Sequence, residues 1–366
     1  SGAVAAYIDS LNISSSFSDI GSILMTLLSL DPGAMNCALF QLQPSMFGAY
    51  AIVEEEIMIQ VRSSISRRTN ELHSSGCSYP DLRGHRVSFW IDGFGGFMGQ
   101  HRFHQSKFHT HNFGGSAGLD VGFGRYVYVG AMGSYNDTHI KWNDHCANGN
   151  GTDRSWYGGI YATWFNKYAF VDVSGVGAKN RYKGARKIQF GNVDRTARHH
   201  HHGHEASANL SAGGNIHVVK QFMIQPFARG DYIFLHQDHF EENNAGSLDL
   251  FVSSKNDKMI RSEGGLNFCY CQDFGKTDLA ITPTISYVRE SRFENRKYKA
   301  AFKKFLSTNG TFTVETGKPD RHIVAPGLTV SSQSFDNRFA FSLNYSGEFG
   351  RHFSENEVSA RLDARF

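Results

Sequence analysis

The feature that most restricts the fold is a strict alternation of apolar and polar residues in RFAFSLNYSGEFGRHFSENEVSARLDARF (338–366). In its final run, Val358 and Phe366 share one parity, whereas Arg361 and Asp363 take the other. Because successive side chains of a strand point to opposite faces, such a run predicts a strand with one apolar and one polar side. A soluble sheet with one buried face has the same period. A last strand that finishes on an aromatic residue is less expected of a soluble domain.

The same two-residue period begins at Arg86 and continues to the end of the chain. It predicts twelve strands, at about 86–99, 111–124, 126–142, 155–166, 168–184, 204–218, 221–238, 259–273, 277–292, 321–332, 338–350 and 356–366. Short connections alternate with long ones, and the long ones are about 100–110, 143–154, 185–203, 239–258 and 293–320. This rhythm and the even strand number are typical of a transmembrane β-barrel. A soluble β-sandwich or adhesin would explain the alternation but not the loop rhythm.

Composition agrees with a barrel and excludes several other classes of protein. The chain has 38 Gly, 30 Phe and 15 Tyr but only 7 Pro, which is rich in glycine and aromatics for a soluble domain. No apolar run is long enough for a transmembrane helix. A net charge of +3 gives no reason to expect nucleic acid as a partner. The sequence suggests no cofactor.

Residues 3–73 follow a helical pattern instead. We expect a short helix at 3–11, a second one capped by Ser18 or Asp19, and a third one opened by Asp31–Pro32, a good N-cap and first-turn pair. A long helix of about 28 residues then opens at Pro44 and would measure about 42 Å.

The long helix carries acidic residues in its first half and arginines in its second half, an order that suits the helix dipole. The charged residues that we expect to meet the barrel are Glu54, Glu55, Arg62, Arg67 and Arg68. An ordinary amphipathic helix on a soluble core would be the alternative.

The polar face of the predicted strands carries charges of both signs and would line the pore. Its members are Asp120, Asp172, Glu205, Arg229, Asp231, Glu263, Arg361 and Asp363. A barrel of twelve strands leaves a lumen roughly 10 Å wide, and an α-helix with side chains is about 10–12 Å across. We therefore predict an all-β membrane protein, a 12-stranded antiparallel barrel plugged by its own N-terminal helical segment. Its parts are short helices at 1–43, a linker helix at 44–85 and the barrel at 86–366.

With these elements in order, the whole chain resembles the C-terminal translocator, or β-domain, of a bacterial type V autotransporter. The resemblance is carried by AVAAYIDSL, ALFQLQPSMFGAYA and SISRRTNEL before the barrel, and by RVSFWIDGFGG, WYGGIYATW and FSLNYSGEFGRHFSENEVSARLDARF within it. The aromatic-rich style is similar to the polymorphic outer-membrane autotransporters of chlamydia-like bacteria. QLQPSMFG departs from the family, which usually has a Gly-Glu pair there.

The resemblance implies a location, a task and partners. The barrel would sit in the bacterial outer membrane, contact its lipids, and export an N-terminal passenger domain to the cell surface and anchor it there. The barrel-assembly machinery would read the last strand, with Val358, Leu362 and Phe366 as the signal. Some family members sever the linker inside the barrel, but no residue here could be matched to that step.

Other chemistry is less well supported by the sequence. A small-solute porin or a rim-type outer-membrane enzyme is the alternative function, the latter using His101, His104, His109 and His111 or Asp137 and His139. These residues lack a nucleophile–base–orienter spacing, so we expect no enzyme and no catalytic residue. HHHHGH (199–204) could bind Ni²⁺ or Zn²⁺, but we expect an incidental loop and no physiological metal site. The cysteines, five in all, are expected to be unpaired thiols.

Overall fold

The fold is described from a computed structural model of the chain. It describes residues 2–11, 18–74, 87–100, 107–144, 146, 148–275, 277–293, 297–315, 321–334 and 338–366. Residues 75–85 of the predicted linker helix at 44–85 lie outside these residues, as do the loop histidines His101 and His104.

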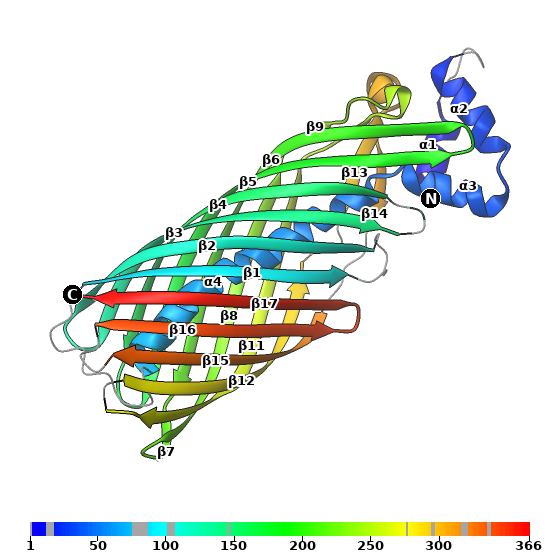
Figure 1. Cartoon of the computed structure of the whole chain (residues 1–366). Helices are drawn as coiled ribbons and strands as arrows, with labels where there is room; N and C mark the ends of the chain where they lie inside the picture. The colour runs from blue at the N-terminus through cyan, green and yellow to red at the C-terminus, as the bar shows by residue number, and fades with distance from the viewer. Residues whose placement is uncertain are drawn as a thin grey trace.

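Twelve antiparallel strands form a closed cylinder, which confirms the predicted strand number (Figure 1). They are β1 (Val87–Gln100), β2 (Phe108–Phe123), β3 (Val127–Asn143), β4 (Asn148–Phe165), β5 (Ala169–Phe190), β6 (Val193–Gly214), β8 (Phe222–Gln237), β11 (Lys255–Asp273), β12 (Thr277–Arg292), β15 (Arg321–Ser334), β16 (Phe339–Gly350) and β17 (Phe353–Arg365). The short β7 (Ile216–Val219) pairs only with β8. The barrel closes where β1 pairs with β17, with Ser88 opposite Arg365.

The connections differ between the two ends of the cylinder, as the loop rhythm predicts. Short turns join strands at the end that holds the C-terminus, and the longer excursions lie at the other end, which we call the outer end (Figure 1). One expected loop, 185–203, is wrong, because β5 and β6 simply continue as a hairpin that turns at Gly191. Gly191 has φ +51°, a backbone conformation that favours glycine.

The strands place apolar side chains outside and polar ones inside, the reverse of a soluble domain. In β17, Val358 and Leu362 are 60% and 52% exposed, whereas Arg361 and Asp363 are 2% and 3% exposed. Because the core of the cylinder is polar, the element that fills it has to supply hydrogen bonds and opposite charges rather than an apolar face.

The helix α4 (Gly48–Ser74) lies inside the barrel and runs obliquely from the outer end towards the end with the C-terminus (Figure 1). A single 3₁₀ turn, η1 (Pro44–Phe47), leads into it. Most of its side chains are buried, including the acidic run at Glu54. Among the described residues, no helix combines the length and the hydropathy needed to span a bilayer.

A small layered structure lies beyond the strand ends at the outer end, and we call it the cap (Figure 1). It contains α1 (Gly2–Asp9), α2 (Asp19–Leu28), α3 (Pro32–Gln41), β9 (Phe240–Glu241), η3 (Gly246–Leu248), β10 (Leu250–Val252), β13 (Lys297–Phe302), η4 (Lys303–Phe305), α5 (Leu306–Asn309) and β14 (Phe312–Glu315). The four strands form their own sheet, in the order β14-β13-β10-β9. The two longest predicted loops therefore contain a sheet, against which α1 packs through Tyr7 and Phe312, whose ring centroids are 4.9 Å apart.

The helix starts of the cap follow the expected capping chemistry. Ser18 accepts a hydrogen bond from the Gly21 amide, and Asp31 accepts hydrogen bonds from the amides of Gly33 and Ala34, with Pro32 at the first helical position. These side chains satisfy amides that would otherwise lack partners at a helix start. The two predicted helix N-caps, Ser18 and Asp31, are confirmed.

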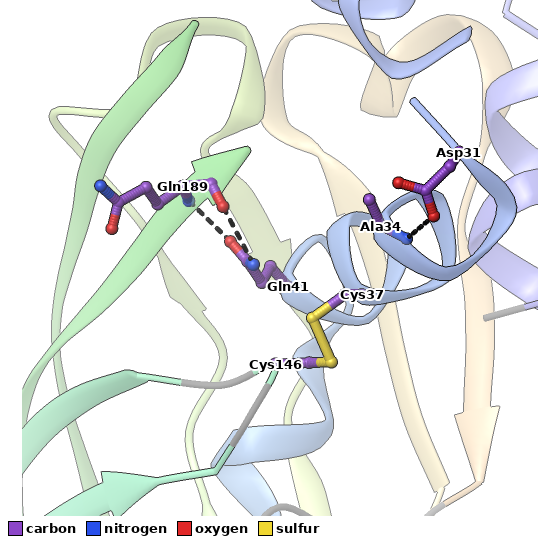
Figure 2. The surroundings of a disulfide bond; sticks show 6 residues. All are labelled: Asp31, Ala34, Cys37, Gln41, Cys146 and Gln189. Carbon is purple, nitrogen blue, oxygen red and sulfur yellow. Dashed lines mark hydrogen bonds between the residues drawn. A yellow bond between two sulfur atoms is a disulfide. The ribbon is translucent and has the colours of Figure 1, made fainter. Parts of the chain in front are cut away.

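A disulfide joins Cys37 of α3 to Cys146 in the β3–β4 connection, so the expectation of unpaired thiols is wrong for this pair (Figure 2). The two residues are 109 positions apart in sequence, with Cα atoms 5.0 Å apart. Beside it, the Gln41 side chain exchanges two hydrogen bonds with the backbone of Gln189, at 2.6 and 3.2 Å (Figure 2). The pairing could not be seen in the sequence because only the docking of α3 on the barrel brings the two cysteines together.

Candidate functional site: the helix-filled lumen

Arg68 joins the helix to two strands of the wall. Its guanidinium group binds Asp120 of β2 through two hydrogen bonds of 2.7 and 2.9 Å and Asp363 of β17 at 2.9 Å. The side chains of all three residues are fully buried. Paired charge-assisted bonds of this kind are strong and fix geometry as well as charge.

Aromatic side chains extend this contact along the wall. The Tyr161 hydroxyl donates to Asp120 at 2.8 Å, and the Trp90 indole N–H donates to the Tyr161 oxygen at 2.7 Å. These rings fit because glycines stand beside them. A Cβ at Gly118 would lie 2.5 Å from Trp90, and one at Gly130 would lie 2.3 Å from Tyr161. Sequence reasoning missed both aromatics, although inward parity beside a glycine-rich strand was an available signal.

The other two predicted helix arginines also find acidic partners. Arg67 binds Asp92 at 2.7 Å and Glu357 at 2.9 Å, and the Arg62 Nε lies 3.1 Å from a carboxylate oxygen of Asp231. The inner half of α4, from Arg62 to His73, is thus mainly basic, and its acidic residue Glu71 lies 3.5 Å from Arg361 and 3.7 Å from Arg365 of the wall. Because an unpaired buried charge is costly, each pair fixes the register of the helix in the bore.

The predicted pore residues that do not meet a helix arginine still face the helix or one another. Asp172 lies 3.5 Å from His73, whose ring stacks on Phe170 at 4.0 Å. Arg229 and Glu263 form a wall-to-wall pair at 3.0 Å. Arg361 donates to the Ser64 carbonyl of α4 at 3.0 Å.

The outer half of α4 carries the opposite charge and is matched only in part. Glu55 binds Arg292, and Glu56 binds Arg321, each at 2.5 Å. Glu54 instead accepts hydrogen bonds from the neutral amides of Asn180, at 2.8 Å, and Gln237, at 3.4 Å. Glu56 and the wall arginines Arg292 and Arg321 were not among the predicted site residues.

Glu54 lies next to two further buried carboxylates, Asp153 of β4 and Glu205 of β6. Both oxygens of Glu205 and one of Asp153 lack a hydrogen-bond partner among the described residues. Asp153, Glu54 and Glu55 place negative charge beside Glu205, and its polar neighbours include Tyr157 and Asn180. The structure therefore brings predicted residues Glu54 and Glu205 together as like charges.

Aromatic packing closes the lumen where α4 begins. The Tyr50 hydroxyl donates to the Lys183 carbonyl at 2.9 Å, and its ring lies 5.7 Å from that of Trp142 and 5.6 Å from that of His199. His201 stacks on Phe240 of the cap, with centroids 4.2 Å apart. The expectation that HHHHGH forms a loop is therefore wrong, because these histidines belong to β6 and alternate inward and outward.

The rim residues considered for catalysis are engaged with one another. Asp137 pairs with Arg154 at 2.8 Å and lies 3.7 Å from His139, whose ring stacks on His111 at 5.1 Å.

Carboxylate oxygens of Glu56, Glu348 and Glu355 lie within 4.8 Å of one another. Because Arg321, Arg261 and Gln60 already bind these carboxylates, this is an ion-paired cluster rather than an open set of metal ligands.

Two cavities remain beside α4, with volumes of about 140 and 100 Å³. Each holds only a few water molecules, since a water occupies about 30 Å³ in the liquid. Polar groups of the wall and of Arg62, Arg67 and Asn70 line the larger cavity. The arrangement can hold a helix firmly, and it leaves little room beside that helix for a second chain.

The barrel is closed and antiparallel, its exterior is apolar, and its polar bore is filled by the chain's own N-terminal segment. These features define an outer-membrane β-barrel that is plugged by its own helix. The sequence profile described as autotransporter beta-domain matches residues 89–346. The chain belongs to this family, and it is an outer-membrane translocator that serves its own N-terminal passenger domain in type V secretion. No curated protein sequence matches the chain.

Solved structures show the same fold at low sequence identity. The translocator domain of the autotransporter NalP from Neisseria meningitidis superposes with a TM-score of 0.66 at 14% identity, covering 88% of this chain and 100% of that one. The β-domain of the Bordetella autotransporter BrkA superposes with a TM-score of 0.57 at 14% identity, covering 77% of this chain and 100% of that one. The transport unit of the autotransporter AIDA-I from Escherichia coli superposes with a TM-score of 0.50 at 14% identity, covering 83% of this chain and 97% of that one.

Proposed function

We propose that the chain has the form of a translocator after export, in which α4 plugs the bore and the cap retains the exported end outside. One observation carries this proposal. The helix α4 lies inside the barrel with its N-terminus at the capped outer end, and its three arginines are paired with carboxylates of the wall. The chain that precedes α4 is thus already outside, where a passenger N-terminal to it would be.

The plug is held by groups that are costly to separate. Withdrawing α4 would remove Arg68, the cation that binds the buried Asp120, and breaking one such buried pair costs about 3–5 kcal/mol. The predicted pore-lining and plug-helix residues would act together in this way. A porin would need an open bore instead.

Conductance in planar bilayers tests the plug. We expect the intact chain to conduct little and a variant lacking residues 2–73 to conduct several times more, since the wall stays complete without α4. A variant lacking only residues 2–41 is the control, because it keeps α4 and should stay nearly closed. Equal conductance of the intact chain and the variant lacking residues 2–73 would contradict the plug and favour the porin.

The cap, with the helices of residues 1–43 as its exported part, would act as a stop on the outside. Cys146 belongs to an outer connection, so Cys37 can pair with it only after the chain around α3 has reached the outer surface. The bond would then oppose backward sliding of the exported segment. It would also fit an oxidising compartment, where disulfides persist.

The last strand would be the assembly signal. Val358, Leu362 and Phe366 are exposed on the outer face of the barrel, and the Phe366 amide donates to the Val87 carbonyl at 2.9 Å, at the seam of the cylinder. We propose that the barrel-assembly machinery reads this face before the seam closes. Replacing Phe366 by Asp should reduce the amount of heat-modifiable barrel in cells, with Phe366→Tyr as the control. An unchanged yield with Phe366→Asp would exclude this role.

We propose no enzymatic role for the chain, because the work described above needs only binding and folding. The purified chain should keep its full mass during incubation after folding. A fragment that ends within 44–85 would instead indicate self-cleavage of the linker.

A further inference from the structure

Three Lys or Arg side chains and three histidines form a stripe on the outer face of the β5–β6 hairpin, which we call the basic stripe. Its members are Lys179, Arg181, Lys183, His200, His202 and His204, and all six are exposed. They alternate with inward-facing neighbours such as Tyr182 and His201. The stripe is therefore built into the parity of two barrel strands and does not depend on a loop.

The sheet register places these residues directly opposite one another. Lys179 faces His204, Arg181 faces His202, and Lys183 faces His200. The Arg181 Nε donates to the His200 Nε2 at 3.0 Å, and the rings of His200 and His202 are 4.8 Å apart. His200 accepts this hydrogen bond through a ring nitrogen that carries no proton, so its imidazole is neutral. The permanent positive charges of the stripe are therefore those of Lys179, Arg181 and Lys183, which share one face of β5 and favour a bound anion.

The chain itself supplies little counter-charge to the stripe. The charged neighbours of His200 among the described residues are His202, Arg181 and Lys183. The nearby outward carboxylates have other partners, since Asp137 binds Arg154 and Asp238 binds His236. The adjacent strand adds no net charge, because Arg154, which stands opposite Arg181, is paired with Asp137.

The stripe begins where the apolar exterior ends. On β5 the outward residues from Ala169 to Gly177 are apolar or glycine, and on β6 the same holds from Ala206 to Gly214. Each run spans nine residues, matching the roughly 9–11 residues that a tilted strand needs to cross the hydrocarbon layer. Trp156 of β4 stands opposite Lys179 at this boundary, where interfacial aromatics are expected.

We propose that the basic stripe binds the phosphate groups of anionic glycolipids in the outer leaflet. Its position at the edge of the apolar band brings it level with lipid headgroups, and its side chains offer donors to phosphate oxygens. A phosphate bound beside β5 would neutralise the charges of Lys179, Arg181 and Lys183 and link the long hairpin to the membrane surface. This inference rests on the outer-membrane location and not on the plug.

The test uses the folded full chain in detergent micelles and lipid A as the probe, either phosphorylated or treated with a phosphatase. Bound lipid is counted by native mass spectrometry at near-physiological salt. We expect the wild type to retain phosphorylated lipid A at least tenfold better than the dephosphorylated form. The triple variant Lys179→Gln, Arg181→Gln, Lys183→Gln should lose that preference.

The matched control removes the same charge from the cap, by Lys297→Gln, Lys303→Gln and Lys304→Gln, and should bind as the wild type does. Heat-modifiable mobility on gels verifies that every variant folds. Equal retention of the two lipid forms, or equal loss in both triple variants, would overturn the proposal. Full displacement by millimolar inorganic phosphate would show a general anion site and would overturn the assignment to lipid.

Discussion

The two halves of α4 are held in the barrel by different means. The inner half carries Arg62, Arg67 and Arg68, and each of these meets a wall carboxylate. The outer half carries acidic residues that are only partly matched, and it relies on aromatic packing around Tyr50 and on the cap. The inner half is therefore fixed in register by charge on all three arginines, whereas the outer half combines two ion pairs with aromatic packing, and a disulfide ties the preceding helix α3 to the barrel.

This difference fits the order in which the parts would meet. Ion pairs between α4 and the wall can form as soon as the helix lies in the bore. The cap can form only when residues at the outer end have emerged, because α1 packs on strands of the outer loops, among them β13 and β14. The ion pairs inside the barrel and the packing of the cap outside it can be disrupted separately. Four substitutions test these two parts one at a time.

The largest effect is expected from Arg68→Ala at the inner end. The change leaves Asp120 buried without a cation, whereas Asp363 keeps Arg361 at 3.0 Å, and breaking the Arg68–Asp120 pair should cost about 3–5 kcal/mol of stability. Urea unfolding in lipid bilayers or micelles measures it, with Arg68→Lys as a control that retains the charge but loses the paired geometry. If Arg68→Ala unfolds at the wild-type urea concentration, the inner half is not held by charge.

Cys37→Ser should have the next largest effect, confined to the cap. Removing a bond between residues 109 positions apart costs at most about 4–5 kcal/mol in the chain-entropy account. We expect faster proteolysis of residues 1–43 while the barrel keeps its heat-modifiable mobility. Cys146→Ser should reproduce the result, and faster digestion of the barrel itself would show that the cap is not an independent unit.

Glu205→Gln addresses the partly matched outer half of α4. Replacing one of three neighbouring carboxylates by a neutral amide removes like-charge repulsion, so stability should rise or stay within about 1 kcal/mol. Asp231→Asn, which breaks the pair with Arg62, should destabilise under the same conditions. A loss for Glu205→Gln as large as that for Asp231→Asn would mean that Glu205 has a cationic partner.

The smallest effect concerns the pH dependence of the cap. Hydrogen bonding from the Arg195 guanidinium holds the pKa of Asp19 well below its ordinary value of 3.8. A lowered folded-state pKa means that the contact stabilises fully above about pH 4 and is lost as the pH falls further. Because the pair is partly exposed, we expect only about 0.5 kcal/mol. Proteolysis of the cap at pH 6 and pH 3 should differ less in Asp19→Asn than in the wild type.

The sequence by itself determined the strands and the helices. Side-chain alternation is a local property, so β17 could be placed from the parity of Val358 and Arg361, and the caps of α2 and α3 follow from Ser18 and Asp31. It also favoured a single helix in the bore, because strand number and helix width are both set by backbone geometry.

Only the tertiary structure decided which residues contact one another. The pairing of Cys37 with Cys146, the partners of Arg68 and the carboxylate neighbours of Glu205 depend on which strands stand beside α4 and at what height. The sheet built from two outer loops and the continuation of β5 and β6 were likewise invisible, because strand pairing is a contact between distant segments. Parity fixes the face on which a residue lies, but closure of the cylinder fixes its neighbour.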